Sequence, residues 1–383
     1  MILTMASWKS TGTYVDEAPP PGAKIVSGMW IFRVKRPPGS PPVFKVRYVA
    51  RGFSQRQGVD YFQTFSPTPK MTTLRVLVHV AAQRDYELHS LDFSTAFLQG
   101  SLHEEICADH LVSLGRFLQV PSGASACQST VSARRLASGT THSGLHLQLL
   151  VYVDYLVFAT NDTEALTLVK SELQKRHTCT YLGELRSYLG LQITRDRARR
   201  TITLSQSHMV HQVLQRFGFQ YSSLQLTPLS PSHSLSAPPS DESVEPSGST
   251  SGMGLVLGGR GPVVLTGHAD TSWVDDSATQ RSSHGYTFSL GSGSVSWRST
   301  CSSSVLSSSC EAEIYAGAMA AQDLRWLTYL LTDLGEQSHS PPVVYVDNKA
   351  MIALCQEHRL EHRTKHIALR YFLESCSSVV SFV

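Results

Sequence analysis

The chain has 383 residues, 41% of them hydrophobic, and a formal net charge of +3 at pH 7. This length allows two or three domains of roughly 100–200 residues each. The sequence has 7 cysteines and no CxxC pair, which argues against a disulfide framework or thiolate zinc site and favours a reducing intracellular compartment, cytoplasmic or nuclear. Neither a signal peptide nor a membrane-spanning stretch is recognisable, so we expect no membrane partner.

The first half of the sequence predicts strands and helices around a buried hairpin. Residues 107–147 differ in being rich in Ser, Ala, Thr and Gly without a sustained period, and residues 222–253 are dense in Ser and Pro, typical of a linker. The expected elements are strands within 24–53, a helix at Thr72–Asp85, a strand at Glu87–Phe93, a hairpin at Leu149–Phe158, and helices at Thr163–Arg176 and His208–Phe217.

After residue 253 the pattern is that of a compact α/β unit. A helix over Glu311–Leu334 is indicated by Ser308 before it, which forms a capping box with Glu311, and by Gly335 after it. The other elements are a strand at Val263–Asp270, a hairpin around Gly291–Gly293, a strand at Val343–Asp347 and a helix from Asn348. The fold class predicted for the chain is therefore α/β (α+β).

Three carboxylates in this unit are candidates for metal binding. Asp270 and Asp347 end predicted strands, and Glu313 lies in the first turns of a predicted helix. Carboxylates that converge from such positions can hold Mg²⁺, and two such ions can promote hydrolysis of a phosphodiester. The alternative is that strand-end aspartates cap turns or helices.

The sequence motifs around these carboxylates resemble those of a known family. Thr266–Trp273, Ser307–Ala316, Val344–Ala350 and Arg363–Ile367 together resemble the ribonuclease H domain of copia-type retrotransposons. The resemblance implies cleavage of the RNA strand of an RNA–DNA hybrid. It also implies that Asp270, Glu313 and Asp347 are the first three of four catalytic carboxylates. The fourth is expected at position 368, where this chain has Ala368.

The first half resembles the reverse transcriptase of the same family. The segments Lys45–Gln55, Gly58–Tyr61 and Leu91–Gly100 are similar to its fingers and first catalytic motif. The resemblance implies an RNA template, a DNA primer and dNTPs as partners, with Asp92 and Asp154 as ligands of Mg²⁺ or Mn²⁺. Tyr155 stands where the family motif has its last aspartate.

The same resemblance suggests further contacts with nucleic acid. Lys45, Arg47 and Arg51 correspond to nucleotide or template contacts, although solvent-facing charge on an edge strand is the alternative. Phe97 corresponds to an aromatic gate against the ribose 2′-hydroxyl, and core packing is its alternative reading.

Internal segments of the family pattern are missing. Only 61 residues separate Asp92 from Asp154, and nothing there resembles the helix that supports template and nucleotide in the family. We therefore expect an internally deleted homologue with an inactive polymerase and a weak or inactive ribonuclease H. The alternatives are a non-catalytic nucleic-acid-binding relic and a pseudogene product, and the oligomeric state stays open.

The predicted domain organisation follows these motifs. It comprises residues 12–106 as fingers and the start of the palm, 107–147 as an aberrant segment, 148–221 as the rest of the palm with the catalytic hairpin, 222–253 as a linker, and 254–376 as a ribonuclease H-like domain with a mixed sheet.

Overall fold

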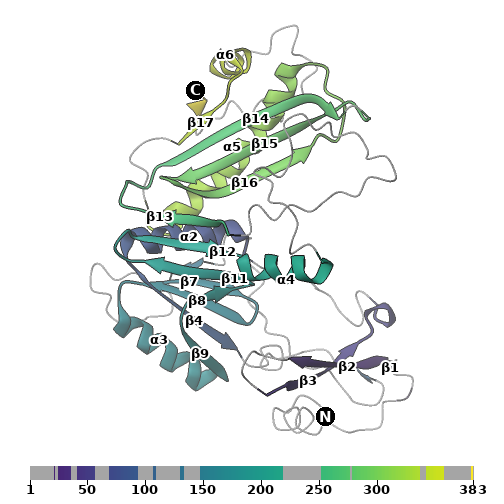
Figure 1. Cartoon of the computed structure of the whole chain (residues 1–383), viewed down its shortest axis with the longest axis vertical. Helices are drawn as coiled ribbons and strands as arrows, with labels where there is room; N and C mark the ends of the chain where they lie inside the picture. Colours follow the sequence, from purple (N-terminus) through teal and green to yellow (C-terminus); the bar gives the residue numbers. More distant parts are fainter. Residues whose placement is uncertain are drawn as a thin grey trace.

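The structure is a computed structural model, shown in Figure 1. It describes residues 21, 25–35, 41–56, 69–93, 107–108, 130–132, 147–218, 252–276, 278–336, 342–357 and 381–382. Among these residues, no helix is both long and apolar enough to cross a membrane. The elements form mixed helix-and-sheet layers, which confirms the predicted α/β class.

The centre of the first half is a five-stranded sheet in the order β6-β7-β8-β4-β9. It contains β4 (Glu87–Phe93), β6 (Thr130–Ser132), β7 (Leu147–Tyr152), β8 (Tyr155–Thr160) and β9 (Cys179–Glu184). Both faces of β8 are covered, since Val157 and Ala159 join a core with helix α2 (Met71–Arg84), and Leu156 and Phe158 join a second core with α3 (Thr163–Arg176). Burial on both faces explains why β8 reads as a continuous apolar run rather than an alternating one.

Two smaller sheets lie at the amino-terminal end. Strands β2 (Gly28–Lys35) and β3 (Val43–Ala50), in the region where strands are predicted, pair antiparallel, and the 3-10 helix η1 (Gly52–Ser54) follows them. Strands β1 (Ile25–Val26) and β5 (Cys107–Ala108) pair parallel. In the hairpin, Phe32 and Phe44 are 66% and 75% exposed, so this sheet has little core of its own.

A four-stranded sheet connects the two halves of the chain. Its order is β10-β11-β12-β13, with β10 (Ser187–Tyr188), β11 (Leu191–Asp196), β12 (Thr201–Ser205) and β13 (Gly254–Gly258). Helix α4 (Ser207–Phe217) follows β12. Strand β13 pairs antiparallel with β12 although the predicted linker separates them. The predicted boundary at residue 254 thus cuts through a sheet that both halves share.

The second half contains a five-stranded mixed sheet in the order β16-β15-β14-β17-β18. Strands β14 (Leu265–Asp276), β15 (Arg281–Leu290) and β16 (Gly293–Cys301) are antiparallel, and β17 (Val343–Tyr345) and β18 (Ser381–Phe382) add in parallel. Helix α5 (Ser309–Asp333) covers one face, as Figure 1 shows, and α6 (Lys349–Glu357) follows β17. The prediction that the strand ends at Asp270 was wrong, because β14 continues to Asp276 through an irregular register after Ser272.

The caps of α5 are those that the sequence indicates. The Ser308 hydroxyl accepts a hydrogen bond from the Glu311 N–H, as in a capping box. The Glu311 carboxylate, however, accepts from the N–H and hydroxyl of Ser307, at 2.9 and 2.7 Å. Gly335 has a φ of 80°, the left-handed conformation that ends many helices.

Helix α2 packs against both halves of the chain. Its residues Leu74 and Leu77 belong to the same buried cluster as Leu324 of α5. The fully buried His79 accepts a hydrogen bond of 3.0 Å at Nδ1 from the Gly258 N–H in β13. The two halves therefore share one core across α2.

Candidate functional site

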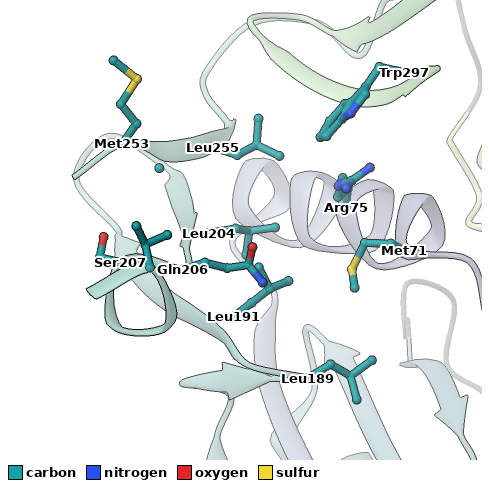
Figure 2. Close-up of a pocket in the computed structure, with 12 residues that line it drawn as sticks. Met71, Arg75, Leu189, Leu191, Leu204, Gln206, Ser207, Met253, Leu255 and Trp297 are labelled. Atoms are coloured by element: carbon teal, nitrogen blue, oxygen red, sulfur yellow. The ribbon is translucent and has the colours of Figure 1, made fainter. Parts of the chain in front are cut away.

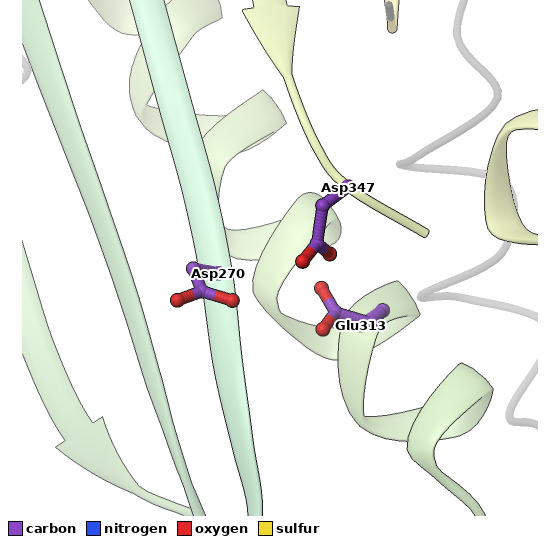
Figure 3. A group of neighbouring side chains, drawn as sticks. All are labelled: Asp270, Glu313 and Asp347. Carbon is purple, nitrogen blue, oxygen red and sulfur yellow. The ribbon is translucent and has the colours of Figure 1, made fainter. Parts of the chain in front are cut away.

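Three carboxylates from three elements meet at one point in the second half. Asp270 lies within β14, Glu313 in the first turns of α5, and Asp347 two residues beyond β17. Each offers a carboxylate oxygen, and these atoms all lie within 4.8 Å of one another. Figure 3 shows the three side chains pointing toward a common centre.

Strand pairing explains how distant residues reach this point. Strands β14 and β17 run parallel, with His268 opposite Tyr345. Since β17 ends at Tyr345, no strand of the described residues flanks β14 at the level of Asp270 on this side. The first turns of α5 bring Glu313 to this place. Glu311, the other acid of the turn, is held by Ser307, so Glu313 rather than Glu311 joins the two aspartates.

The electrostatics of the cluster centre on Glu313, which is only 5% exposed. Burial, together with the smaller effects of the negative charges of Asp347 and Asp270, raises the pKa of its carboxyl to about 7. Its Oε2 atom is buried and has no hydrogen-bond partner among the residues that the structure describes. A buried carboxylate beside two others is costly when ionised unless a cation compensates it. The three oxygen ligands are of the type that Mg²⁺ and Mn²⁺ take, so the residues fit a divalent cation.

The fourth carboxylate position lies outside the described residues, because Ala368 falls in a part of the chain that the structure does not describe. Within the described ranges, the metal-binding geometry joins Asp270, Glu313 and Asp347 only. Asp270 Oδ1 accepts a hydrogen bond of 2.8 Å from the Thr271 N–H, which orients this carboxylate.

The two predicted polymerase carboxylates lie on neighbouring elements, Asp92 on strand β4 and Asp154 in the turn before the adjacent strand β8. Asp92 in β4 is paired with Tyr155 in β8, and the Phe93 N–H donates a hydrogen bond of 2.7 Å to the Asp154 carbonyl. Asp154 is exposed in the tight β7–β8 turn, where Val153 has a left-handed φ of 52°. The hairpin thus brings Asp92 and Asp154 to the same end of the sheet.

Tyr155, which we predict to replace a third carboxylate, is packed against neighbouring side chains. Its hydroxyl donates to the Ser187 carbonyl at 3.1 Å. Its ring meets that of Tyr188 edge-on at a centroid distance of 5.6 Å, and Tyr152 meets Tyr188 similarly at 6.1 Å. The Tyr155 side chain therefore packs in a cluster with Tyr152 and Tyr188, and its hydroxyl is bonded to the Ser187 carbonyl rather than available as a metal ligand.

The predicted nucleotide contacts lie in or next to β3, apart from Phe97. The backbone of Lys45 and Arg47 lies in β3, but their side chains, like the whole of Phe97, fall outside what the structure describes. Arg51 is exposed beside η1, and its N–H donates to the Ser27 carbonyl. The contacts of these residues with nucleic acid stay predictions.

The arginine-rich hairpin of β11 and β12 has structural partners. Arg195 bonds the Tyr86 carbonyl at 2.6 Å and pairs with Asp85 at 2.5 Å, while Arg197 pairs with Glu87 at 2.8 Å. These two arginines hold the hairpin against the turn between α2 and β4.

A cleft of about 460 Å³ opens beside α2 at the junction of the two halves. Figure 2 shows its lining, which is mostly apolar and includes Leu191, Leu204 and Leu255. Trp297 and Arg75 form one rim, with the guanidinium carbon 3.8 Å from the indole centroid.

One feature beside the carboxylates was not predicted from the sequence. The rings of His268 and Tyr345 stack at a centroid distance of 5.2 Å and an interplanar angle of 25°. Each residue precedes an aspartate of the cluster by two positions, Asp270 and Asp347 respectively. This shared spacing is the one sequence feature that could have pointed to the stack. The spacing alone is insufficient, because the rings meet only through the pairing of β14 with β17.

Comparison with known proteins defines the class of the chain. A family model described as "Reverse transcriptase (RNA-dependent DNA polymerase)" matches residues 12–114 and 131–231, which is more than half of the sequence. The chain belongs to this family. Both matched parts reach into the segment 107–147 that we interpret as aberrant, since the first ends at residue 114 and the second begins at residue 131. Residues 115–130 lie outside the match.

Three relatives that align with more than nine tenths of the chain are retrovirus-related Pol polyproteins from plant transposons of the copia type. The chain is 28% identical to the retrovirus-related Pol polyprotein from transposon TNT 1-94 of Nicotiana tabacum, over 96% of this chain and 34% of the relative. It is also 28% identical to the Pol polyprotein from transposon RE2 of Arabidopsis thaliana, over 92% of this chain and 29% of the relative. The chain thus spans about a third of these relatives' length. The first alignment runs over 449 residues, more than the chain contains, so the relative has residues that this chain lacks.

Proposed function

We propose that the chain is a retrotransposon-derived nuclease that hydrolyses the RNA strand of an RNA–DNA hybrid at Asp270, Glu313 and Asp347. The observation that carries this proposal is the convergence of their carboxylate oxygens to within 4.8 Å of one another. Such convergence leaves Glu313 with a pKa raised to about 7 by burial and by its two acidic neighbours. The neighbouring negative charges of such a cluster destabilise the folded chain, and a bound cation compensates this repulsion.

The chemistry depends on divalent metal. Two Mg²⁺ or Mn²⁺ ions held by these residues would supply an activated water and charge compensation at the leaving oxygen. Asp270 and Asp347 are exposed and can face the phosphodiester, while Glu313 reaches the cluster from the buried side. Because Ala368 stands at the expected fourth position, we expect weaker metal binding and slower hydrolysis than a complete set would give.

We infer further that the chain does not synthesise DNA from an RNA template, a DNA primer and dNTPs. Phosphoryl transfer depends on positioning and on metal charge. Asp92 and Asp154 remain, but Tyr155 offers a hydroxyl that is bonded to the Ser187 carbonyl. The sequence between Asp92 and Asp154 also contains no motif that resembles the template-supporting helix implied for the family.

The test is cleavage of an end-labelled RNA within an RNA–DNA hybrid by the purified full-length chain, in Mg²⁺, in Mn²⁺ and in chelator. We expect metal-dependent cleavage that Asp270→Asn and Glu313→Gln each reduce by roughly 100-fold or more, since charge compensation by metal contributes several kcal/mol. Products should carry 3′-hydroxyl ends, whereas a contaminating metal-independent ribonuclease would leave cyclic phosphates. Folded protein that binds the hybrid without metal-dependent cleavage would instead support a non-catalytic nucleic-acid-binding relic, the alternative that Tyr155 and Ala368 favour.

A further inference from the structure

The sheet of the second half has a face that α5 does not cover. Successive residues of a strand point to opposite faces. Ala269 and Phe288 are buried in the core that contains Leu324 of α5. The neighbouring positions therefore belong to the opposite face, where His268 is exposed and Tyr345 is 43% exposed.

Aromatic side chains form a row across this face. Tyr345 in β17 is paired with His268 in β14, His268 with Thr287 in β15, and Thr287 with Trp297 in β16. Residues directly opposite one another share a face, so the four side chains lie in one line. Adjacent strands are about 4.8 Å apart, so the row spans about 14 Å, enough for a few nucleotides of an unpaired strand.

Each end of the row presents an aromatic surface. At one end, the His268–Tyr345 stack lies beside Asp270 and Asp347. At the other end, Trp297 is 50% exposed, and one of its faces carries the Arg75 guanidinium at 3.8 Å, as Figure 2 shows. Aromatic platforms with a nearby arginine are the means by which proteins bind single-stranded nucleic acid, because every base has a ring face to stack.

We propose that this face binds a single-stranded extension of the hybrid, with unpaired bases stacked on the His268–Tyr345 pair and on Trp297. Bases inside a duplex are already stacked on one another, so stacking on an exposed aromatic row adds little to the binding of a duplex. An unpaired strand that leaves the cleavage site meets the His268–Tyr345 pair first. The inference rests on the proposed nuclease site for the presence of nucleic acid, and it adds the substrate class: hybrids that continue into a single strand.

The test compares two labelled probes with the full-length chain in metal-free buffer, where cleavage cannot occur. One probe is a short blunt-ended RNA–DNA hybrid, and the other is the same hybrid with a single-stranded extension of a few nucleotides. We expect the extension to lower Kd by roughly tenfold, in line with the usual gain from stacking a base on an aromatic side chain. The gain should disappear in the double variant His268→Ala/Tyr345→Ala and decrease in Trp297→Ala.

Matched variants separate stacking from stability. His268→Phe/Tyr345→Phe retains both rings and should retain the gain, and Tyr329→Ala removes a tyrosine that is 64% exposed on α5, away from this face, and should change nothing. Equal Kd values for the two probes, or a gain that survives the double alanine variant, would overturn the inference. Failure of the proposed function is distinguishable, because it appears as absent hybrid cleavage while the gain in binding persists.

Discussion

Arg84 and Glu336 lie 252 positions apart in the sequence and are joined by two hydrogen bonds, of 2.9 and 2.7 Å. The glutamate side chain is 6% exposed, whereas the arginine is 53% exposed. The hydrogen bond to Glu336 raises the pKa of Arg84. The pair links the last residue of α2 to the segment that follows α5, so the two halves of the chain are coupled.

Replacing Arg84 tests this coupling. Arg84→Ala leaves a buried carboxylate without its partner, and we expect the free energy of unfolding to fall by about 2 kcal/mol, less than for a fully buried pair because Arg84 is half exposed. Urea unfolding followed by tryptophan fluorescence measures it. Arg199→Ala is the control, since Arg199 is 83% exposed and meets Asp196 only at 3.7 Å. Equal stability of the two variants would contradict the coupling.

Gly258 is a second point of close contact between the halves. Its φ is 98°, and a Cβ there would collide with the Arg200 carbonyl and lie 2.6 Å from the Ala82 Cβ. We expect Gly258→Ala to lower the free energy of unfolding by roughly 2–4 kcal/mol, through strain and a forced separation of β13 from α2. Gly252→Ala, where a Cβ meets no atom of the described residues within 4 Å, should be nearly neutral. A tolerated Gly258→Ala in thermal unfolding would show that β13 does not pack as described.

His79 makes the shared core sensitive to acid. Burial lowers its pKa to about 4, against a smaller opposing effect of the Glu336 charge. Because the folded-state pKa lies below the unfolded value of 6.5, the stabilising contribution is complete above pH 6.5 and is lost as the pH falls toward 4. Between pH 6.5 and 5 this loss amounts to about 2 kcal/mol.

The measurement is urea unfolding of the wild type and of His79→Gln at both pH values. The glutamine cannot take up the proton, so its stability should fall less on acidification. The comparison uses the change with pH rather than absolute stability, because the substitution also disturbs the hydrogen bond from Gly258. Identical changes for the two proteins would exclude His79 as the source.

An aspartate at position 155, the residue that the resemblance implies for the family, should lower the free energy of unfolding. Tyr155→Asp places a carboxylate directly opposite Asp92 and next to Asp154, and it removes the ring packed on Tyr188. We expect a loss of roughly 1–3 kcal/mol without metal, while Tyr155→Phe should lose less than about 1 kcal/mol. Primer extension should be absent for both variants and for the wild type, and DNA synthesis by the wild type would refute the inferred inactivity.

The local elements could be predicted because their determinants are local. Helix α3 spans Thr163–Arg176 as predicted, and the Asp162 side chain accepts from the Glu164 and Ala165 N–H groups at its start. The carboxylate cluster could be anticipated because each member stands in a short recognisable motif, although the role of these residues in catalysis stays a proposal.

The joining of the halves could not be predicted in this way. The pairing of β13 with β12 and the contact of Arg84 with Glu336 depend on residues separated by long stretches of chain, and no periodicity encodes them. The Ser/Pro-rich composition of 222–253 indicates a flexible connection but says nothing of whether the flanking parts pack together. The His268–Tyr345 stack escaped prediction for the same reason, since it exists only through the register of two parallel strands.

The most direct test of the central claim is Mn²⁺ binding by the full-length chain, followed through the electron paramagnetic resonance signal of the free ion. The account predicts binding in the wild type, loss in Asp347→Asn and in Asp270→Asn, and retention in Glu164→Gln, which removes an exposed acid of α3 outside the cluster. If the wild type and the two aspartate variants bind Mn²⁺ equally, the carboxylates of Asp270, Glu313 and Asp347 are not a metal site, and the proposed nuclease has no chemical basis.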